Sequence, residues 1–184
     1  MRMSRTRCVR ALLATGMLTV FGLAGCSTTD TFEQPAPVPE IESSVELDQV
    51  WSMSVGDGHD DEFLYLTPLN TGDILYAASA DGEGYAVQSE NGKVLWQAEL
   101  EDRIFAGVGG DNDRLYLTTR DAELLALSRE DGTELWRVSL HTEVLATPQS
   151  NGRLVFAHNT DARVLAVVAN TAENIWEYNG VHPG

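Results

Sequence analysis

Tryptophan recurs in this chain at a fixed interval, and this periodicity constrains the fold more than any other feature. Three of the four tryptophans are 40 residues apart, and the fourth precedes them: Trp51, Trp96, Trp136 and Trp176. Each of the last three follows an aromatic residue by 20 positions, an aspartate by 15 and an alanine by 10. Glycine stands four positions before two of them, at Gly92 and Gly132, and Ala172 takes that place in the third repeat. An internal period of this length predicts a row of equal structural units.

Each unit has the pattern of four short strands. The second unit shows it most clearly, with expected strands at 104–108, 114–118, 124–128 and 133–139. Turn-forming residues separate these strands, at 109–112, 120–121 and 129–132. Asn-Gly and Asp-Gly pairs in such turns supply the positive φ of tight hairpins. The two central strands are apolar on both faces, which is typical of a sheet that other sheets cover on both sides.

Four strands in about 40 residues are typical of a β-propeller blade. Helical repeats would need apolar residues every 3.6 positions, and no segment after Leu47 combines that spacing with helical caps. We therefore predict an all-β fold: an incomplete propeller spanning 45–184, with four-stranded blades at about 63–99, 104–139 and 144–178. A segment at about 50–55, which carries Trp51, is predicted to be the outer strand that closes a further blade.

The repeated residues have structural roles in this interpretation. Each indole is expected to fill the gap between adjacent blades, where an aromatic side chain buries about 150–250 Å². The glycine four residues earlier permits the hairpin that aims the indole. The repeated aspartates are expected to cap turns through their side chains: Asp81, Asp121 and Asp161.

The first 25 residues have the organisation of a bacterial lipoprotein signal. Four arginines precede an apolar run at 11–23, which is too short for a bilayer span of about 20 residues. The run ends in a lipobox: Leu23, Ala24, Gly25 and Cys26. In a lipobox the cysteine thiol takes a diacylglyceryl group, and two or three acyl chains anchor a protein stably. The alternative is an ordinary secretory signal with a chance cysteine.

A polar segment follows the predicted lipidated cysteine. Residues 26–44 contain Pro35, Pro37 and Pro39 and are expected to form a tether of polyproline character. Ser27 is not the aspartate that retains lipoproteins in the inner membrane of enteric bacteria. The expected location is therefore the periplasmic face of the outer membrane.

Composition and motif content exclude several function classes. The formal net charge of −16 argues against nucleic-acid binding, which needs a basic surface. The two cysteines cannot build a disulfide framework or a cysteine-rich metal site. No nucleophile elbow, P-loop or zinc-protease motif occurs. The acidic loop around His59 and the Asp111–Asp113 run lack calcium-loop spacing, and no metal, cofactor or catalytic residue is expected.

The blade sequence resembles a known repeat. Residues 86–96 and 126–136 match the pattern A-[LV]-x-x-x-x-G-x-x-x-W of pyrroloquinoline-quinone-type (PQQ-like) blades. Together with the lipobox, the tether and the Val50–Gly56 strand, these blades resemble the BamB family of outer-membrane lipoproteins. The likeness extends from about Val50 to Trp176.

That resemblance implies a non-enzymatic scaffold of the β-barrel assembly (BAM) machinery. Such a scaffold would bind the periplasmic POTRA domains of BamA, other BAM subunits and unfolded outer-membrane proteins. The family has about eight blades, roughly 320 residues at about 40 per blade. The chain is therefore expected to be an N-terminal portion of such a propeller, with the BamA contacts beyond Gly184.

Two other functions fit a lipoprotein with PQQ-like blades. One is a quinone-dependent periplasmic dehydrogenase, although such enzymes often carry a vicinal cysteine pair, which this chain lacks. The other is a propeller lipoprotein that binds cell-wall polymer or a different envelope partner.

Overall fold

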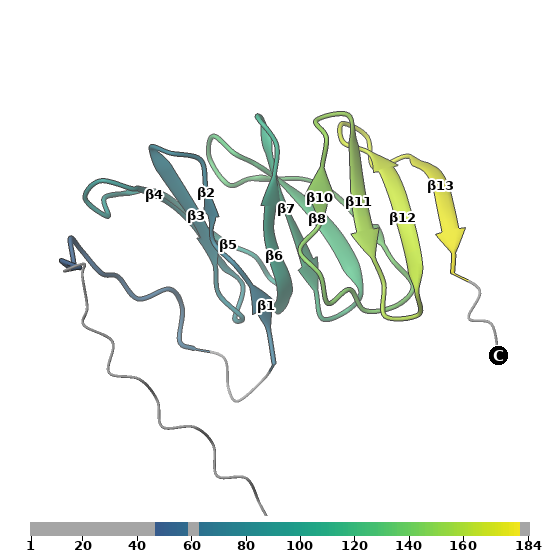
Figure 1. Ribbon diagram of the computed structural model, residues 1–184, viewed down its shortest axis with the longest axis horizontal. Coiled ribbons are helices and arrows are strands. Elements are labelled where there is room, and N and C mark those ends of the chain that lie inside the picture. Colours follow the sequence, from purple (N-terminus) through teal and green to yellow (C-terminus); the bar gives the residue numbers. More distant parts are fainter. Residues whose placement is uncertain (1–46, 59–62, 181–184) are drawn as a thin grey trace, which may run out of the picture. The chain divides into compact units, whose positions relative to one another are not determined.

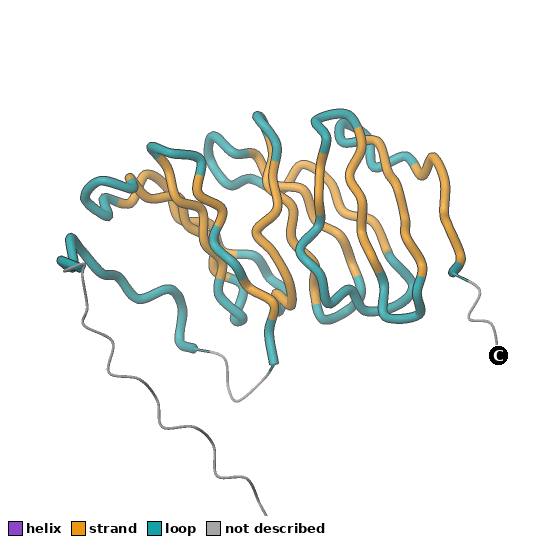
Figure 2. Tube along the Cα trace, viewed as in Figure 1, coloured by secondary structure: helices purple, strands orange, loops and turns teal. Residues whose placement is uncertain are grey.

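A computed structural model describes residues 47–58 and 63–180, which belong to one compact unit. These residues form thirteen β-strands and no helix, arranged as three sheets side by side (Figure 1). The loops gather at the two ends of the strands (Figure 2). The predicted all-β architecture of four-stranded blades is confirmed.

Each sheet contains one antiparallel blade of four strands in chain order. We call the first strand of each blade the inner strand and the fourth the outer strand. Blade 1 consists of β2 (Leu69–Asn70), β3 (Ile74–Ala78), β4 (Glu83–Gln88) and β5 (Val94–Glu99). Blade 2 consists of β6 (Ile104–Gly110), β7 (Arg114–Thr119), β8 (Glu123–Ser128) and β9 (Glu134–Ser139). Blade 3 consists of β10 (Gln149–Ser150), β11 (Leu154–His158), β12 (Arg163–Val168) and β13 (Asn174–Asn179).

The third and fourth strands of every blade share one register. An alanine of the third strand lies opposite the tryptophan of the fourth, as Ala86 does with Trp96 and Ala126 with Trp136. The register shifts directly after each of these alanines, at the same place in all three blades. A bulge of this kind bends the outer strand. The alanine column of the repeat therefore leaves room for an indole beside the bulge.

The hydrophobic core lies at the junctions between blades. One cluster joins blade 2 to blade 3 and contains Tyr116, Leu124 and Val155, all fully buried. A second joins blade 1 to blade 2 and contains Tyr76, Leu115 and Leu127. Residues on both faces of β7 and β8 are buried, because a neighbouring sheet covers each face.

The inner strands of neighbouring blades approach closely, and glycine makes this possible. A Cβ atom on Gly109 would lie 2.0 Å from the carbonyl oxygen of Pro148 in the next blade. A Cβ atom on Gly110 would lie 2.6 Å from Leu69 Cδ2 in the preceding blade. Both glycines are part of β6, so the turn predicted from residue 109 begins only after Gly110.

The segment before blade 1 differs from the predicted strand boundaries. Its strand β1 (Tyr65–Leu66) leaves blade 1 and pairs in parallel with β6, with Tyr65 opposite Ala106. Thr67 extends this pairing, since its N–H donates to Gly107 O at 2.6 Å. The predicted closing segment at 50–55 has no strand assignment in the described structure. A strand ladder there would need neighbouring strands that the described residues do not supply.

Candidate functional site

Three of the four indoles form the same hydrogen bond with the next sheet. Trp51 Nε1 donates to Ser89 O at 2.8 Å, Trp96 Nε1 to Arg129 O at 3.2 Å, and Trp136 Nε1 to Ala169 O at 2.9 Å. The three acceptors are main-chain carbonyls 40 residues apart. Trp51 thus occupies on blade 1 the position that Trp96 occupies on blade 2 and Trp136 on blade 3.

The turn residues Gly92 and Gly132 also form the surface on which the preceding indole lies. Gly92, Gly132 and Ala172 have φ of 69°, 77° and 59°. A Cβ atom on Gly92 would lie 2.7 Å from Trp51, and one on Gly132 would lie 2.7 Å from Trp96. Glycine therefore permits both the left-handed turn and the close approach of the ring.

Each of the last three tryptophans also packs against the aromatic residue 20 positions earlier. The ring centroids of Tyr76 and Trp96 are 6.1 Å apart, and those of Tyr116 and Trp136 are 6.0 Å apart. Trp176 lies 6.0 Å from Phe156 in the same tilted arrangement. The indoles and their neighbours account for the aromatic columns of the sequence as packing groups.

For Asp81 and Asp161, the structure shows contacts other than the turn caps that were expected of the repeated aspartates. The turn amides of Glu83 and Glu123 are capped by the hydroxyls of Ser79 and Thr119, at 3.0 and 3.2 Å. Asp81 accepts hydrogen bonds from the Ser79 hydroxyl and from the N–H of Asp57, and these bonds lower its pKa. In blade 3, Asp161 forms an ion pair with Arg163 at 2.9 Å. A serine or threonine two positions before the aspartate was the signal for the cap.

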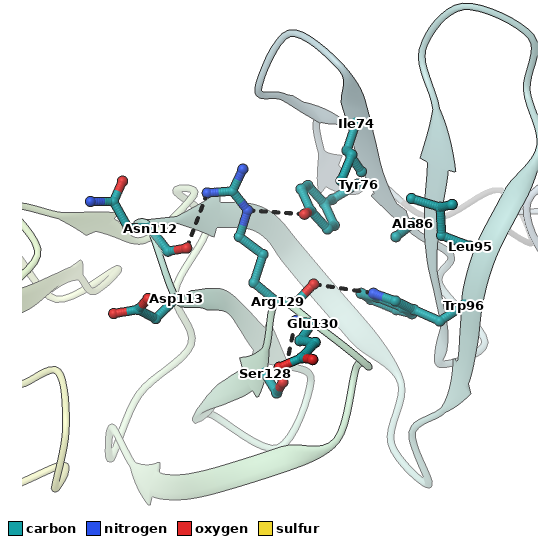
Figure 3. A pocket seen from close by; sticks show the side chains of 10 residues that line it. All are labelled: Ile74, Tyr76, Ala86, Leu95, Trp96, Asn112, Asp113, Ser128, Arg129 and Glu130. Atoms are coloured by element: carbon teal, nitrogen blue, oxygen red, sulfur yellow. Dashed lines mark hydrogen bonds between the residues drawn. The ribbon is translucent and has the colours of Figure 1, made fainter.

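A cleft of about 510 Å³ opens between blades 1 and 2 (Figure 3). One wall consists of Ile74, Tyr76, Leu95 and Trp96 from blade 1. The opposite wall comes from two turns of blade 2 and includes the side chain of Arg129. Sequence reasoning did not identify this cleft, because its two walls come from different blades.

Arg129 crosses the junction at the upper end of the cleft. Its Nε donates to Tyr76 OH at 2.9 Å, and its guanidinium carbon lies 5.2 Å from the centre of the Tyr76 ring. Its Nη1 donates to the carbonyl oxygens of Asp111 and Asn112, at 3.0 and 3.3 Å. The positive charge is therefore directed toward an aromatic ring and two carbonyls.

At the junction between blades 2 and 3, Asp111 bonds the hydroxyl of Tyr116, as Arg129 bonds that of Tyr76 at the first junction. Burial opposes ionisation of its carboxyl, but hydrogen bonds outweigh that effect and lower its pKa. Its donors are Tyr116 OH at 2.6 Å, Ser150 Oγ at 3.2 Å and the N–H groups of Asp113 and Arg114, both at 2.9 Å. The carboxylate therefore serves to link three strands and has no free face for catalysis.

Arg137 links the outer parts of blades 1 and 2. It contacts three carboxylates, with Glu134 at 2.6 Å, Glu123 at 2.9 Å and Asp102 at 2.9 Å. The hydrogen bond to Glu134 is the largest cause of the raised pKa of Arg137 and of the lowered pKa of Glu134. Blade 3 reverses the charges, since Arg163 stands at the position of Glu123 and bonds Glu177 at 3.1 Å.

The remaining sequence candidates have no common site. The lipobox with Cys26 and the acidic loop residue His59 lie outside the described residues. His141 and His158 are exposed and come from different loops or strand ends. Among residues 47–58 and 63–180, no three His, Cys, Asp or Glu side chains are placed to share a metal ion. The same part of the chain contains no helix that could span a membrane.

Comparison with known proteins decides between the possible families. A family model described as outer membrane protein assembly factor BamB matches residues 80–184, which is more than half of the chain. The chain belongs to the BamB family. The BamB of Marinobacter adhaerens is 64% identical over 107 residues, covering 58% of this chain and 27% of that relative. The BamB of Pseudomonas aeruginosa is 42% identical over 100 residues, covering 54% and 25%.

Solved structures agree with this membership. BamB from Moraxella catarrhalis has a TM-score of 0.56 and 29% identity, over 65% of this chain and 36% of that structure. A europium-containing methanol dehydrogenase has the same TM-score at 21% identity, over 72% of this chain and 27% of that structure, which reflects the shared blade fold alone. The chain spans about a quarter of the length of the curated BamB relatives that it matches.

Proposed function

We propose that the protein is a non-enzymatic scaffold of the outer-membrane β-barrel assembly machinery. One observation carries this proposal: the match to proteins named as outer membrane assembly factors covers blades 2 and 3 entirely and begins within blade 1. The side chains described at the blade junctions also support this proposal, because their contacts are packing, capping and ion pairs that stabilise the blades.

Anchoring through a lipid on Cys26 is part of the same proposal. The lipobox at 23–26 and the proline-containing segment after it support a folded body held near the outer membrane on its periplasmic face. Within the tether, the 13 residues at 27–39 in extended form reach roughly 40 Å at about 3.1 Å per residue. Such a length lets the blades approach a partner that is embedded in the same membrane.

The outer strands give a scaffold of this kind a physical means of contact. β5, β9 and β13 each lie at the end of their sheet and pair with one strand only. The unpaired main-chain groups of an edge strand can bind an extended segment by β-augmentation. The proposed partners are the POTRA domains of BamA, other BAM subunits and unfolded outer-membrane proteins.

Co-purification tests the proposal. We would express the full-length protein with a carboxy-terminal tag in a Gram-negative host, solubilise membranes in mild detergent and probe the eluate for BamA. BamA is expected in the eluate. An eluate without BamA would refute the scaffold proposal. If that eluate contained peptidoglycan, it would also favour the polymer-binding alternative.

A Cys26→Ala variant tests the anchor separately. Wild-type protein is expected in the membrane fraction with an acylated residue 26 by mass spectrometry, and the variant in the soluble fraction. If residue 26 of the wild-type protein is unmodified, the anchoring proposal is wrong.

A further inference from the structure

The junction between blades 2 and 3 differs from the junction between blades 1 and 2 at the place of the cleft. In blade 2 the position of Ile74 is taken by Arg114, and Arg114 Nη2 forms a hydrogen bond with Asn170 Oδ1 of blade 3. This side chain bridges the second junction at the place where the first is open. Ile74 is too short and too apolar to make the equivalent bridge to Glu130 across the first junction.

Apolar side chains cover one wall of the cleft, and Leu95 remains 43% exposed there. Ile74, Leu95 and Trp96 line the same wall, so the wall can contact a bulky apolar group (Figure 3). Leu95 precedes Trp96 on β5, which is an edge strand. An extended peptide alongside β5 could therefore place one side chain in the cleft while its main chain follows the strand.

The rim of the cleft is acidic. The Asp113 side chain is 79% exposed and reaches Arg114 only at 4.0 Å, and Glu130 is exposed on the adjacent turn. Arg129 carries a positive charge in the same lining, where it bonds Tyr76 and two carbonyls, so the two carboxylates leave one negative charge in excess. A positively charged group next to the apolar group would therefore be favoured over a negative one.

We propose that this cleft binds a bulky apolar side chain of an extended polypeptide that carries basic residues on either side. The inference deepens the proposed scaffold function and rests on it for its biological meaning: the occupant is the unfolded chain that the machinery handles. Ile74, Leu95 and Trp96 contact the apolar side chain, and Asp113 and Glu130 attract the flanking basic residues.

Fluorescence anisotropy with labelled peptides tests the cleft directly on the purified full chain. The probe is a short peptide of alternating threonine and lysine with one central phenylalanine. Its companions replace phenylalanine by alanine, or lysine by glutamate. Each replacement is expected to weaken binding about tenfold or more, since a buried phenylalanine and an adjacent opposite charge are lost.

Three variants locate the binding site. Ile74→Arg gives the first junction the residue that bridges the second, and Leu95→Ala removes part of the wall; each is expected to weaken binding about tenfold. Leu135→Ala is the matched control, because Leu135 holds the same strand position at the second junction and is 49% exposed. It should bind the peptide as the wild type does.

The outcomes separate this inference from the scaffold function. Unchanged binding in Ile74→Arg and Leu95→Ala, equal loss in Leu135→Ala, or no binding by the wild type would each overturn the cleft. Leu95→Ala keeps the test valid if Ile74→Arg fails to fold, as judged by its thermal transition. BamA is not present in the assay, so loss of co-purification with intact peptide binding would refute only the scaffold.

Discussion

The two junctions between complete blades share one contact and differ in another. In both, an indole N–H donates to a main-chain carbonyl of the next blade, at Arg129 in the first junction and at Ala169 in the second. A carbonyl acceptor does not depend on the side chain that its residue carries. The side chains at the outer rim are therefore free to differ, and the rim holds an open cleft in one junction and an arginine bridge in the other.

Removing an indole should have the largest effect on stability, because each junction is closed by one indole that is packed and hydrogen-bonded. Trp136→Ala is expected to destabilise the protein by about 3 kcal/mol, somewhat below fully buried cases since the ring is partly exposed. Trp136→Phe retains a ring against Tyr116 and loses the bond to Ala169, at a cost of about 1 kcal/mol. Urea unfolding of both variants measures this difference, and equal costs would mean that ring burial contributes little.

The turn residue four positions before each of the last three tryptophans differs between repeats, and changing it should affect stability less than removing an indole. Gly132→Ala is expected to cost about 2–3 kcal/mol, because the added methyl would lie 2.7 Å from Trp96 at a φ of 77°. The reverse change in blade 3, Ala172→Gly, relieves a left-handed alanine but removes a methyl group. Its effect on unfolding free energy should stay within about 1 kcal/mol. A large loss in Ala172→Gly would show that the third repeat depends on that methyl.

The outer ion pairs allow one blade to be converted into another. Arg137→Glu places a negative charge among three carboxylates and is expected to cost about 1–2 kcal/mol. Adding Glu123→Arg recreates the arrangement of Arg163 and Glu177 in blade 3 and should restore about 0.5–1 kcal/mol. Thermal melts at low and high salt provide the measurement, since salt screens these partly exposed charges. A double variant no more stable than the single one would contradict the pairing.

The sequence predicted the parts of the fold that repeat. Tryptophan spacing was sufficient to predict three blades, because an indole at a blade junction requires a matching turn 33–36 residues later. The pairing of Tyr65–Leu66 with β6 was not predictable, since these residues read equally well as the inner strand of blade 1. That choice depends on how closely two inner strands approach, which local patterns do not encode.

The candidate site was predicted less well than the fold. The aspartates at 81, 121 and 161 form a column, yet hydroxyls two positions earlier make the caps in blades 1 and 2. The cleft depends on one difference between repeats, Ile74 in place of Arg114. The sequence does not show the effect of this difference, because the partner of Arg114 is Asn170 of the next blade. Repeats thus reveal architecture through what they share and candidate sites through where they depart.

The smallest expected effect concerns the second junction and its response to acid. The pKa of Asp111 is lower in the folded protein than in the unfolded chain. Its contribution to folding stability is therefore complete above the unfolded pKa of about 4 and is lost as the pH falls through the folded pKa. Asp111→Asn is expected to cost about 1 kcal/mol at neutral pH, because an amide is a weaker acceptor for Tyr116, Ser150 and two N–H groups. The gap between the two proteins should narrow below about pH 4. Urea midpoints measured from pH 2 to 7 test this, and a gap that is independent of pH would show that the charge of Asp111 does not hold blades 2 and 3 together.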